Sequence, residues 1–277
     1  MNEQEFSYLK KKILKLTGIN LDNYKSQQMR RRLNGFFAHV QAKNIVEYCQ
    51  MLERDSELLT ELRNFLTINV SEFFRDVNPF EQLRKMILPK LLKNNPRLNI
   101  WSAGCSHGQE PYTIAMILEG IFPFHNHRVL ATDIDEGALK LAKAGGPYSS
   151  DEIKNVSSAF LRKYFTCSNG DYVVTDRIKR RVEFRRQNLL CDDFEKGFDL
   201  IICRNVTIYF TEEAKRHLNR RFYQSLKDGG VLFIGGTEVM LDIISIGLKG
   251  LVASFYQKPM PIVSKITEAK EEITLRV

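Results

Sequence analysis

The strongest constraint on the fold is an alternation of strand-like and helical runs that begins after Pro96. The runs typical of buried strands, rich in β-branched and aromatic residues, are LNIWSAG, HRVLATDID, RVEFRRQNL, FDLIICRN, GGVLFIGG and, last, LVASFYQK. The runs with helical spacing between them are EPYTIAMILEGI, EGALKLAKAG and EEAKRHLNRRFYQSL. This alternation predicts an α/β domain with an open, doubly wound, mostly parallel sheet that binds its ligand at the carboxyl ends of the strands.

Residues 1 to about 70 show helical spacing and no strand signal. The apolar positions from Phe6 to Leu16 predict a first helix that stops at Gly18, and Asp22 is a candidate cap for the second helix. Two further helices are expected at 45–52 and 57–66. We therefore predict a small all-α N-terminal domain at 1–72, a linker and connecting helix at 73–96 punctuated by Pro89, the sheet domain at 97–258 and a loosely held tail at 259–277.

Composition indicates a soluble globular protein, since 43% of the 277 residues are hydrophobic and 27% are charged. No stretch approaches the roughly 18 to 20 apolar residues of a membrane span, and the N-terminus lacks the apolar core of a signal peptide. We therefore expect a cytoplasmic protein. Its five cysteines are scattered and contain no Cys-x-x-Cys pair, so neither a disulfide framework nor a structural zinc site is expected.

The net charge of +8 is concentrated near the N-terminus. Residues 8–43 contain nine lysines and arginines against Asp22 alone, so the remainder of the chain is neutral overall. This basic face, whose densest cluster is Arg30, Arg31 and Arg32, is a candidate docking surface for an acidic partner. A solvated helix that carries basic side chains explains the same residues without a partner.

A glycine-containing turn joins the first strand of the sheet domain to its first helix. Gly104 and Gly108 let the backbone approach a ligand closely, and the helix that begins near Glu110 points N–H groups at that ligand. Asp133, at the end of the second strand, can accept hydrogen bonds from both ribose hydroxyls of an adenosine-type cofactor. Asp135 is better explained as the cap of the next helix.

Glu110 bears on the identity of the cofactor. A dinucleotide would bring two phosphate charges close to this carboxylate, whereas S-adenosylmethionine carries a sulfonium and an ammonium and no phosphate. Glu110 therefore favours S-adenosylmethionine, although the helix dipole alone would also explain an acidic residue in a first turn.

The fourth strand, FDLIIC, is followed by Asn205 and Tyr209, which we expect in the cleft of the sheet. Enzymes that methylate exocyclic amines of nucleobases usually carry Pro-Pro and an aromatic residue after an Asn or Asp at this point. No Pro-Pro follows Asn205. The nucleic-acid interpretation is weakened accordingly.

In combination, these motifs resemble the CheR-type glutamate methyltransferases that act on bacterial chemoreceptors. The matching segments are NVSEFFR at 69–75, WSAGCS at 101–106, GQEPY at 108–112, ATDID at 131–135, NL at 188–189 and CRNVTIYF at 203–210. With the basic helical region they cover roughly residues 5 to 257. The resemblance implies a class I, Rossmann-like methyltransferase fold, S-adenosylmethionine as the cofactor, S-adenosylhomocysteine as its product, and no metal.

By resemblance, the cofactor contacts fall on Asn69, Ser71, Arg75, Glu110, Asp133, Asn188, Leu189, Asn205 and Val206. Ser71 keeps the hydroxyl of a frequent Thr, whereas Gln109 replaces a frequent Glu and Thr207 a frequent Leu or Met. The two residues expected to act in catalysis are Arg75, which would grip a carboxylate near the sulfonium, and Tyr209, which would orient the acceptor oxygen.

The implied reaction transfers the methyl group from the sulfonium to a glutamate oxygen of a receptor. A glutamate with a pKa of about 4.3 is already ionised at neutral pH, so the reaction needs alignment and not a general base. The expected partners are Glu- and Gln-rich methylation helices of chemoreceptors, docked on the basic face, with no nucleic acid, no membrane insertion and a monomeric enzyme. Two alternatives remain, namely an RNA or DNA methyltransferase that uses the basic face on phosphate, and a non-catalytic S-adenosylmethionine-binding regulator.

Some members of the resembled family carry a small β-subdomain with a Gly-x-x-Gly loop that binds the receptor's C-terminal tail peptide. The equivalent stretch here, 163–184, contains YFTC, an Asn-Gly turn and YVVT, which predict a short hairpin. It contains a single glycine, so the Gly-x-x-Gly loop is absent. We therefore expect an enzyme that recognises the methylation region directly and does not bind tail peptides.

Overall fold

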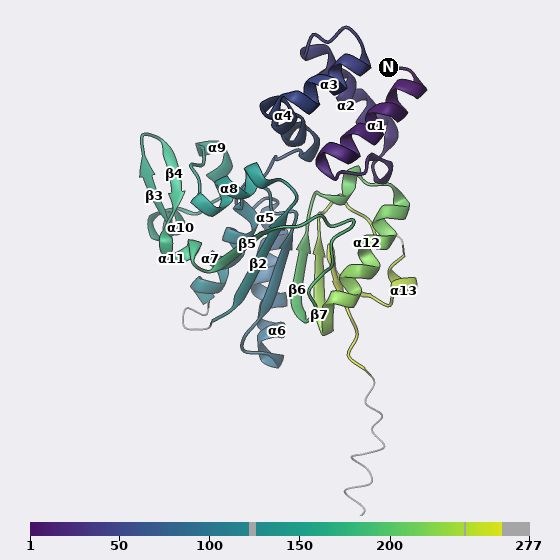
Figure 1. Cartoon of the computed structure of the whole chain (residues 1–277). Coiled ribbons are helices and arrows are strands. Elements are labelled where there is room, and N and C mark those ends of the chain that lie inside the picture. Colours follow the sequence, from purple (N-terminus) through teal and green to yellow (C-terminus); the bar gives the residue numbers. More distant parts are fainter. Residues whose placement is uncertain (122–125, 241, 262–277) are drawn as a thin grey trace, which may run out of the picture.

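The computed structural model describes residues 1–121, 126–240 and 242–261, which form a helical domain and a larger α/β domain (Figure 1). Apolar side chains one helical turn apart, such as Phe6, Leu9 and Ile13, are buried in the core of the helical domain. Its elements are α1 (Glu3–Thr17), the 3₁₀ turn η1 (Leu21–Asn23), α2 (Ser26–His39), α3 (Ile45–Arg54) and α4 (Ser56–Thr67).

Local capping explains the bounds of α1 but not the start of α2. Asn2 and Glu5 form a capping box at the start of α1, and Gly18 ends it in the left-handed region with a φ of 74°. The prediction that Asp22 caps the second helix is wrong, because Asp22 lies inside η1 and forms an ion pair with Lys10. The helix α2 begins without a side-chain cap, and the backbone before it is fixed by pairing with the α/β domain, as described below.

The chain reaches the sheet through α5 (Val77–Gln82), the π-helical turn η2 (Leu83–Ile87) and α6 (Leu88–Asn94). The sequence predicts an interruption at Pro89, but the structure shows none, because Pro89 lies in the first turn of α6. Proline has no N–H to donate to the preceding turn, and the wider π-helical turn before Pro89 accommodates that loss.

The central sheet has the strand order β5-β2-β1-β6-β7-β9-β8. The first five strands of this order are parallel, and β9 is antiparallel to both of its neighbours. The order reverses between β1 and β6, which places a ligand-binding crevice at their carboxyl ends. This confirms the predicted open, mostly parallel sheet. The strands are β1 (Asn99–Ala103), β2 (Arg128–Asp133), β5 (Val182–Arg186), β6 (Phe198–Cys203), β7 (Leu226–Ile234), β8 (Lys249–Val252) and β9 (Phe255–Gln257).

Helices cover both faces of the sheet, and alternate strand residues face opposite layers. Ile100 of β1 packs with residues of α5, α6, α7 (Gln109–Ile121) and α8 (Glu136–Ala144). The next residue, Trp101, packs with α12 (Glu212–Ser225) and α13 (Ile243–Ile246). Because both faces of the central strands β1, β2 and β6 are buried, these strands appear in the sequence as nearly continuous apolar runs.

The last strand-like run forms two strands and not one. Ser254, with a φ of 72°, turns the chain between β8 and β9, so the prediction of a single strand over LVASFYQK is wrong. The predicted tail at 259–277 lies outside the described residues from 262 onward. No helix in the described part of the chain has the length and apolar character needed to cross a membrane.

A separate two-stranded hairpin, β3 (Phe165–Ser168) and β4 (Asp171–Val174), lies within residues 163–184. Ser168 pairs with Asp171, so Asn169 and Gly170 form the turn, both with positive φ. The short helices around it are α9 (Ser150–Ile153), α10 (Ser158–Tyr164) and α11 (Asp176–Lys179). Arg177 of α11 forms an ion pair with the buried Glu119 of α7, which fixes this insertion to the sheet domain.

Candidate functional site

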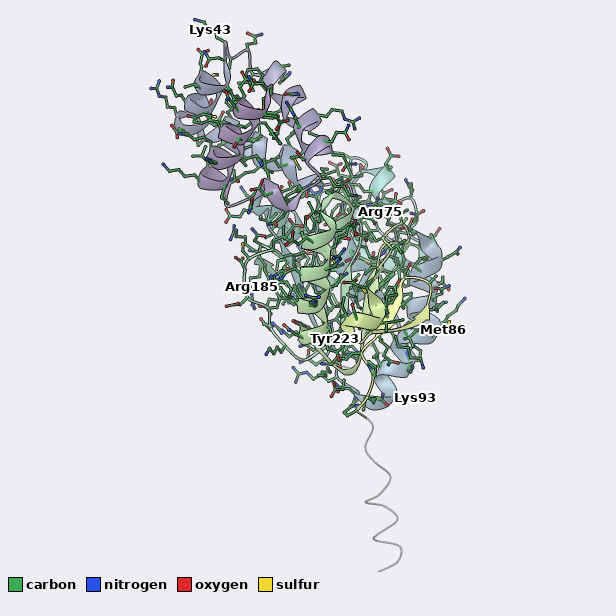
Figure 2. The ribbon with its side chains drawn as sticks, turned by 90° about the vertical axis from the view of Figure 1, so that its right-hand side faces the viewer. Lys43, Arg75, Met86, Lys93, Arg185 and Tyr223 are labelled. Atoms are coloured by element: carbon green, nitrogen blue, oxygen red, sulfur yellow. The ribbon has the colours of Figure 1, made fainter. Side chains whose placement is uncertain are left out.

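A pocket lies between the helical domain and the carboxyl ends of β1, β2, β5 and β6. It encloses about 1020 Å³ when its open mouth is included. Figure 2 shows Arg75 on the side of the α/β domain that faces the helical domain. Tyr209 lines the pocket, as do all nine predicted cofactor residues: Asn69, Ser71, Arg75, Glu110, Asp133, Asn188, Leu189, Asn205 and Val206.

The turn after β1 approaches the segment after β6 so closely that only glycine fits. Gly104 has a φ of 82°, and a Cβ there would lie 2.4 Å from Cγ2 of Val206. Ser106, with a φ of 49°, turns its backbone N–H toward Asp133, whose Oδ2 accepts it at 2.7 Å. The turn and the end of β2 therefore form one rigid wall of the pocket.

Asp133 is buried in that wall and accepts hydrogen bonds only from backbone in the described residues. Its Oδ1 accepts from the N–H of Asp135 at 3.0 Å, in addition to the bond from Ser106. Burial raises the pKa of the Asp133 carboxyl, and the backbone donors oppose that rise. Each carboxylate oxygen can accept a second hydrogen bond, so the predicted role toward ribose hydroxyls is compatible with this arrangement.

Asp135 has a second function besides capping α8. Its Oδ1 accepts from the N–H of Ala138, which is the cap that the sequence predicts. Its Oδ2 accepts from the side chains of Thr67 at 2.8 Å and Asn69 at 2.6 Å. Asp135 thus anchors the linker between the domains and orients the amide of Asn69, leaving the carbonyl oxygen of that amide for a ligand.

Glu110 is held by one hydroxyl and one cation. Its Oε1 accepts from Oγ of Ser102 at 2.8 Å, and its Oε2 lies 3.8 Å from Nη1 of Arg204. Burial raises the pKa of the Glu110 carboxyl, and Arg204 and Ser102 oppose that rise. A buried carboxylate that is incompletely compensated favours a cationic ligand in the pocket.

Arg204 is a functional candidate that sequence reasoning missed. Its guanidinium is buried against the rings of Phe80 and Phe233. It donates to Oδ2 of Asp76 at 2.7 Å and to the backbone carbonyl of Arg75 at 3.0 Å. Its position inside the CRNV motif was the available signal, but its ion-pair and hydrogen-bond partners are more than 90 residues away in sequence.

Arg75 differs from Arg204 in having no ion pair among the described residues. Its Nη1 donates to the carbonyl of Val70 at 2.9 Å. Its neighbours Phe74 and Asp76 both have positive φ, a strained backbone that packing and the Asp76–Arg204 ion pair maintain. Arg75 is therefore a positive charge held at the pocket but not neutralised.

Matches to known proteins agree with this geometry. Residues 69–245 match the sequence profile described as CheR methyltransferase, SAM binding domain, and residues 4–67 match the profile of the CheR methyltransferase all-alpha domain. The chain belongs to the CheR methyltransferase family. The resemblance found in the motifs is thereby confirmed, and so is the class I methyltransferase fold with an all-α N-terminal domain.

Three relatives of this CheR methyltransferase match over most of their lengths. The chemotaxis protein methyltransferase of Listeria monocytogenes is 39% identical over 92% of this chain and 98% of its own length. Chemotaxis protein methyltransferase 1 of Pseudomonas aeruginosa is 36% identical over 82% of this chain and 86% of its own. The chemotaxis protein methyltransferase of Borreliella burgdorferi is 36% identical over 87% of this chain and 89% of its own length.

The pocket of this CheR methyltransferase fits S-adenosylmethionine. Three carboxylates line it, namely the buried Asp133, the nearly buried Glu110 and Glu72, and of its two arginines Arg204 is already ion-paired. This balance suits a ligand that carries a sulfonium and an ammonium and no phosphate. Among the described residues, no group of three or more His, Cys, Asp or Glu side chains could hold a metal ion.

Glu238 holds the loop that carries Asn205 and Tyr209, and no sequence signal pointed to it. Its Oε2 accepts from the N–H groups of Asn205 and Gly235, each at 2.8 Å. Its Oε1 accepts from both the N–H and the hydroxyl of Thr207, at 2.8 and 2.7 Å. The Thr that replaces a frequent Leu or Met of the family therefore supplies one more bond to this carboxylate.

The arginine cluster does not form one continuous exposed surface. Arg30 forms an ion pair with Glu3 and also donates to the carbonyl of Met1. Arg32 donates to the carbonyl of Phe65 and lies over its ring, with a centroid distance of 4.6 Å. Arg31 is exposed and forms no ion pair within the described residues. Docking through this cluster stays a prediction, and Arg31 is the member available for it.

Replacing Glu110 with glutamine should raise the stability of the cofactor-free protein at pH 7. The pKa of Glu110 is higher in the folded state than in the unfolded state. Between these two pKa values the folded state binds more protons, so the folded protein loses stability as pH rises through this range. Glutamine removes this loss, which should increase the midpoint of thermal unfolding by about 2 to 4 °C. The difference should vanish below the unfolded pKa of Glu110.

The same variant should gain less stability from S-adenosylmethionine than the wild type, because the cationic ligand no longer meets a carboxylate. Thermal unfolding at several pH values, with and without cofactor, measures both effects. A glutamine variant that is less stable at pH 7 but equally stabilised by cofactor would show that Glu110 serves the fold and not the ligand.

Proposed function

We propose that this CheR methyltransferase methylates glutamate side chains of bacterial chemoreceptors, forming methyl esters, as a cytoplasmic monomer. The observation that carries the proposal is the charge at the pocket, where Arg75 lines the cavity and forms no ion pair among the described residues. A carboxylate acceptor is already ionised at neutral pH and needs a cation to position it, which Arg75 supplies. The names of the relatives, which are chemotaxis protein methyltransferases, support the same conclusion.

In the proposed mechanism some pocket residues bind the cofactor and others position the acceptor. When bound, S-adenosylmethionine supplies an activated methyl group on its sulfonium. Asn69, Ser71, Asp133, Asn188, Leu189, Asn205 and Val206 bind the cofactor, and Glu110 faces its positive charge. Arg75 aligns the acceptor carboxylate, and Tyr209, in the 3₁₀ turn η3 (Thr207–Tyr209), orients its oxygen. The acceptor carboxylate would take up the methyl group without losing a proton, so Arg75 and Tyr209 need only hold its oxygen in place.

Recognition of the receptor is proposed to rely on the methylation region and not on the tail peptide. The hairpin has a two-residue turn, Asn169-Gly170, and forms a sheet of its own. A Gly-x-x-Gly docking loop is absent from 163–184. Arg31 on α2 is the proposed contact for the acidic receptor helix.

The function is tested by incubating the full-length protein with methyl-labelled S-adenosylmethionine and membranes that contain the host's receptors. Label that enters protein and is released by mild alkali marks an ester and is the expected result. Receptors with the C-terminal tail removed should be labelled at the same rate. Label in nucleic acid, or cofactor binding without transfer, would contradict the proposal, and a rate that depends on the tail would contradict its second part.

Charge reversal at Arg31 should weaken receptor methylation by about two- to fivefold in kcat/KM, as expected for one exposed charge pair. The affinity for S-adenosylhomocysteine should not change, because Arg31 does not line the pocket. The loss should shrink as salt is added, since ions screen exposed charges. Lys93→Glu is the matched control, because Lys93 is exposed at the end of the α/β domain that lies away from the helical domain (Figure 2). Equal rates for Arg31→Glu and wild type would remove Arg31 from the docking surface.

A further inference from the structure

The helical domain is joined by backbone pairing to the loop after β6 that carries Asn205 and Tyr209. The N–H of Lys25 donates to the carbonyl of Tyr209, and the N–H of Thr211 donates to the carbonyl of Asn23, both at 2.9 Å. These two bonds flank an antiparallel bridge between Tyr24 and Phe210. In such a non-hydrogen-bonded pair the two side chains lie close together, and here the rings meet edge to face with centroids 5.1 Å apart.

This pairing places Tyr24 in the wall of the cofactor pocket, although it belongs to the helical domain. Asp133 is near enough to raise the pKa of the Tyr24 phenol, together with burial, which is the larger cause. The helical domain touches the pocket at a second point, where Nδ2 of Asn188 donates to the carbonyl of Gly18. The predicted cofactor site is thus closed on one side by residues 18–24.

The hydroxyl of Tyr24 is free to bind a ligand. It has no hydrogen-bond partner among the described residues. The hydroxyls of Tyr48 and Tyr164 also lack a partner but are fully buried, whereas the hydroxyl of Tyr24 is not. Because Tyr24 lines the pocket, its accessible hydroxyl opens into the pocket. Because a phenol can both donate and accept, it can bond to ribose hydroxyls or adenine nitrogens.

We propose that Tyr24 is a cofactor-binding residue supplied by the helical domain, and that its hydroxyl contacts the nucleoside part of S-adenosylmethionine beside Asp133. The helical domain then completes the cofactor site as well as docking a partner. Since α2 begins two residues after Tyr24, receptor docking and cofactor binding share one short segment of backbone. The inference concerns cofactor binding alone, so it does not depend on which acceptor is methylated.

The test is calorimetry on full-length Tyr24→Phe, which removes the hydroxyl but keeps the ring packed on Phe210. Affinity for S-adenosylhomocysteine should fall about five- to tenfold, near the upper end for loss of one neutral hydrogen bond. Affinity for 5′-methylthioadenosine, which lacks the amino acid end, should fall by the same factor. The midpoint of urea unfolding should stay at the wild-type value, because the hydroxyl bonds to no described residue.

Tyr48→Phe is the matched control, since it removes a buried hydroxyl from the core of the same domain, away from the pocket. It should bind both ligands with wild-type affinity. Unchanged affinity in Tyr24→Phe would show that Tyr24 only packs the two domains together and would overturn the proposal. A loss limited to S-adenosylhomocysteine would overturn the nucleoside assignment, and an equal loss in Tyr48→Phe would show a general effect on the domain.

Discussion

Replacing Arg75 with alanine should lower kcat/KM for the receptor about 100-fold at saturating cofactor, the loss associated with roughly 1 Å of misalignment between reactants. The acceptor carboxylate loses charge as the ester forms, so Arg75 cannot act by stabilising a developing negative charge. Its proposed role is to hold the carboxylate in line with the methyl group. The measurement is the initial rate of receptor methylation over a range of receptor concentrations.

Arg75→Lys should lose about tenfold, because lysine keeps the charge but not the planar fork that grips a carboxylate. Arg97→Ala is a suitable control, since Arg97 is exposed just before the amino end of β1, opposite the pocket. If Arg75→Ala turned over receptor at the wild-type rate while Arg97→Ala did the same, the proposed alignment by Arg75 would be wrong.

Replacing Asp133 with alanine should weaken S-adenosylhomocysteine binding at least tenfold, since hydrogen bonds to a charged group contribute about 1.5 to 3 kcal/mol. The change removes the predicted acceptor for the ribose hydroxyls and also frees the N–H groups of Ser106 and Asp135. Calorimetry on the folded variant measures the affinity, and thermal unfolding measures the accompanying loss of stability.

Asn44→Ala separates these two effects of the Asp133 variant. It removes the N-cap of α3, none of whose residues lines the pocket, and should cost about 1 kcal/mol of stability. It should nevertheless bind S-adenosylhomocysteine as the wild type does. An Asp133→Ala protein with wild-type affinity would exclude this carboxylate from the cofactor site.

Local sequence patterns determined the architecture of the α/β domain. Runs such as FDLIIC specify buried parallel strands because every residue of such a strand meets a helical layer. The Asn-Gly pair specified a two-residue hairpin turn because both positions need positive φ. The positions of Glu110 and Asp133 after β1 and β2 placed them at the same edge of the sheet, where the pocket is found.

Tertiary structure decided which side chains are partners. Asp22 has the sequence context of a helix cap, but Lys10 and the pairing of Tyr24 with Phe210 determine its place. Arg30 and Arg32 are predicted from the sequence to belong to a docking surface. In the structure Arg30 forms an ion pair with Glu3, and Arg32 lies over the ring of Phe65.

The sequence does not reveal the contacts of Arg204 and Glu238, because their partners come from other elements of the fold. Periodicity encodes the type of an element and the face that it buries, which depend on neighbours within a few residues. The charge balance of the pocket, and the approach of Tyr24 to it, depend on distances across domains that arise only when those faces pack together.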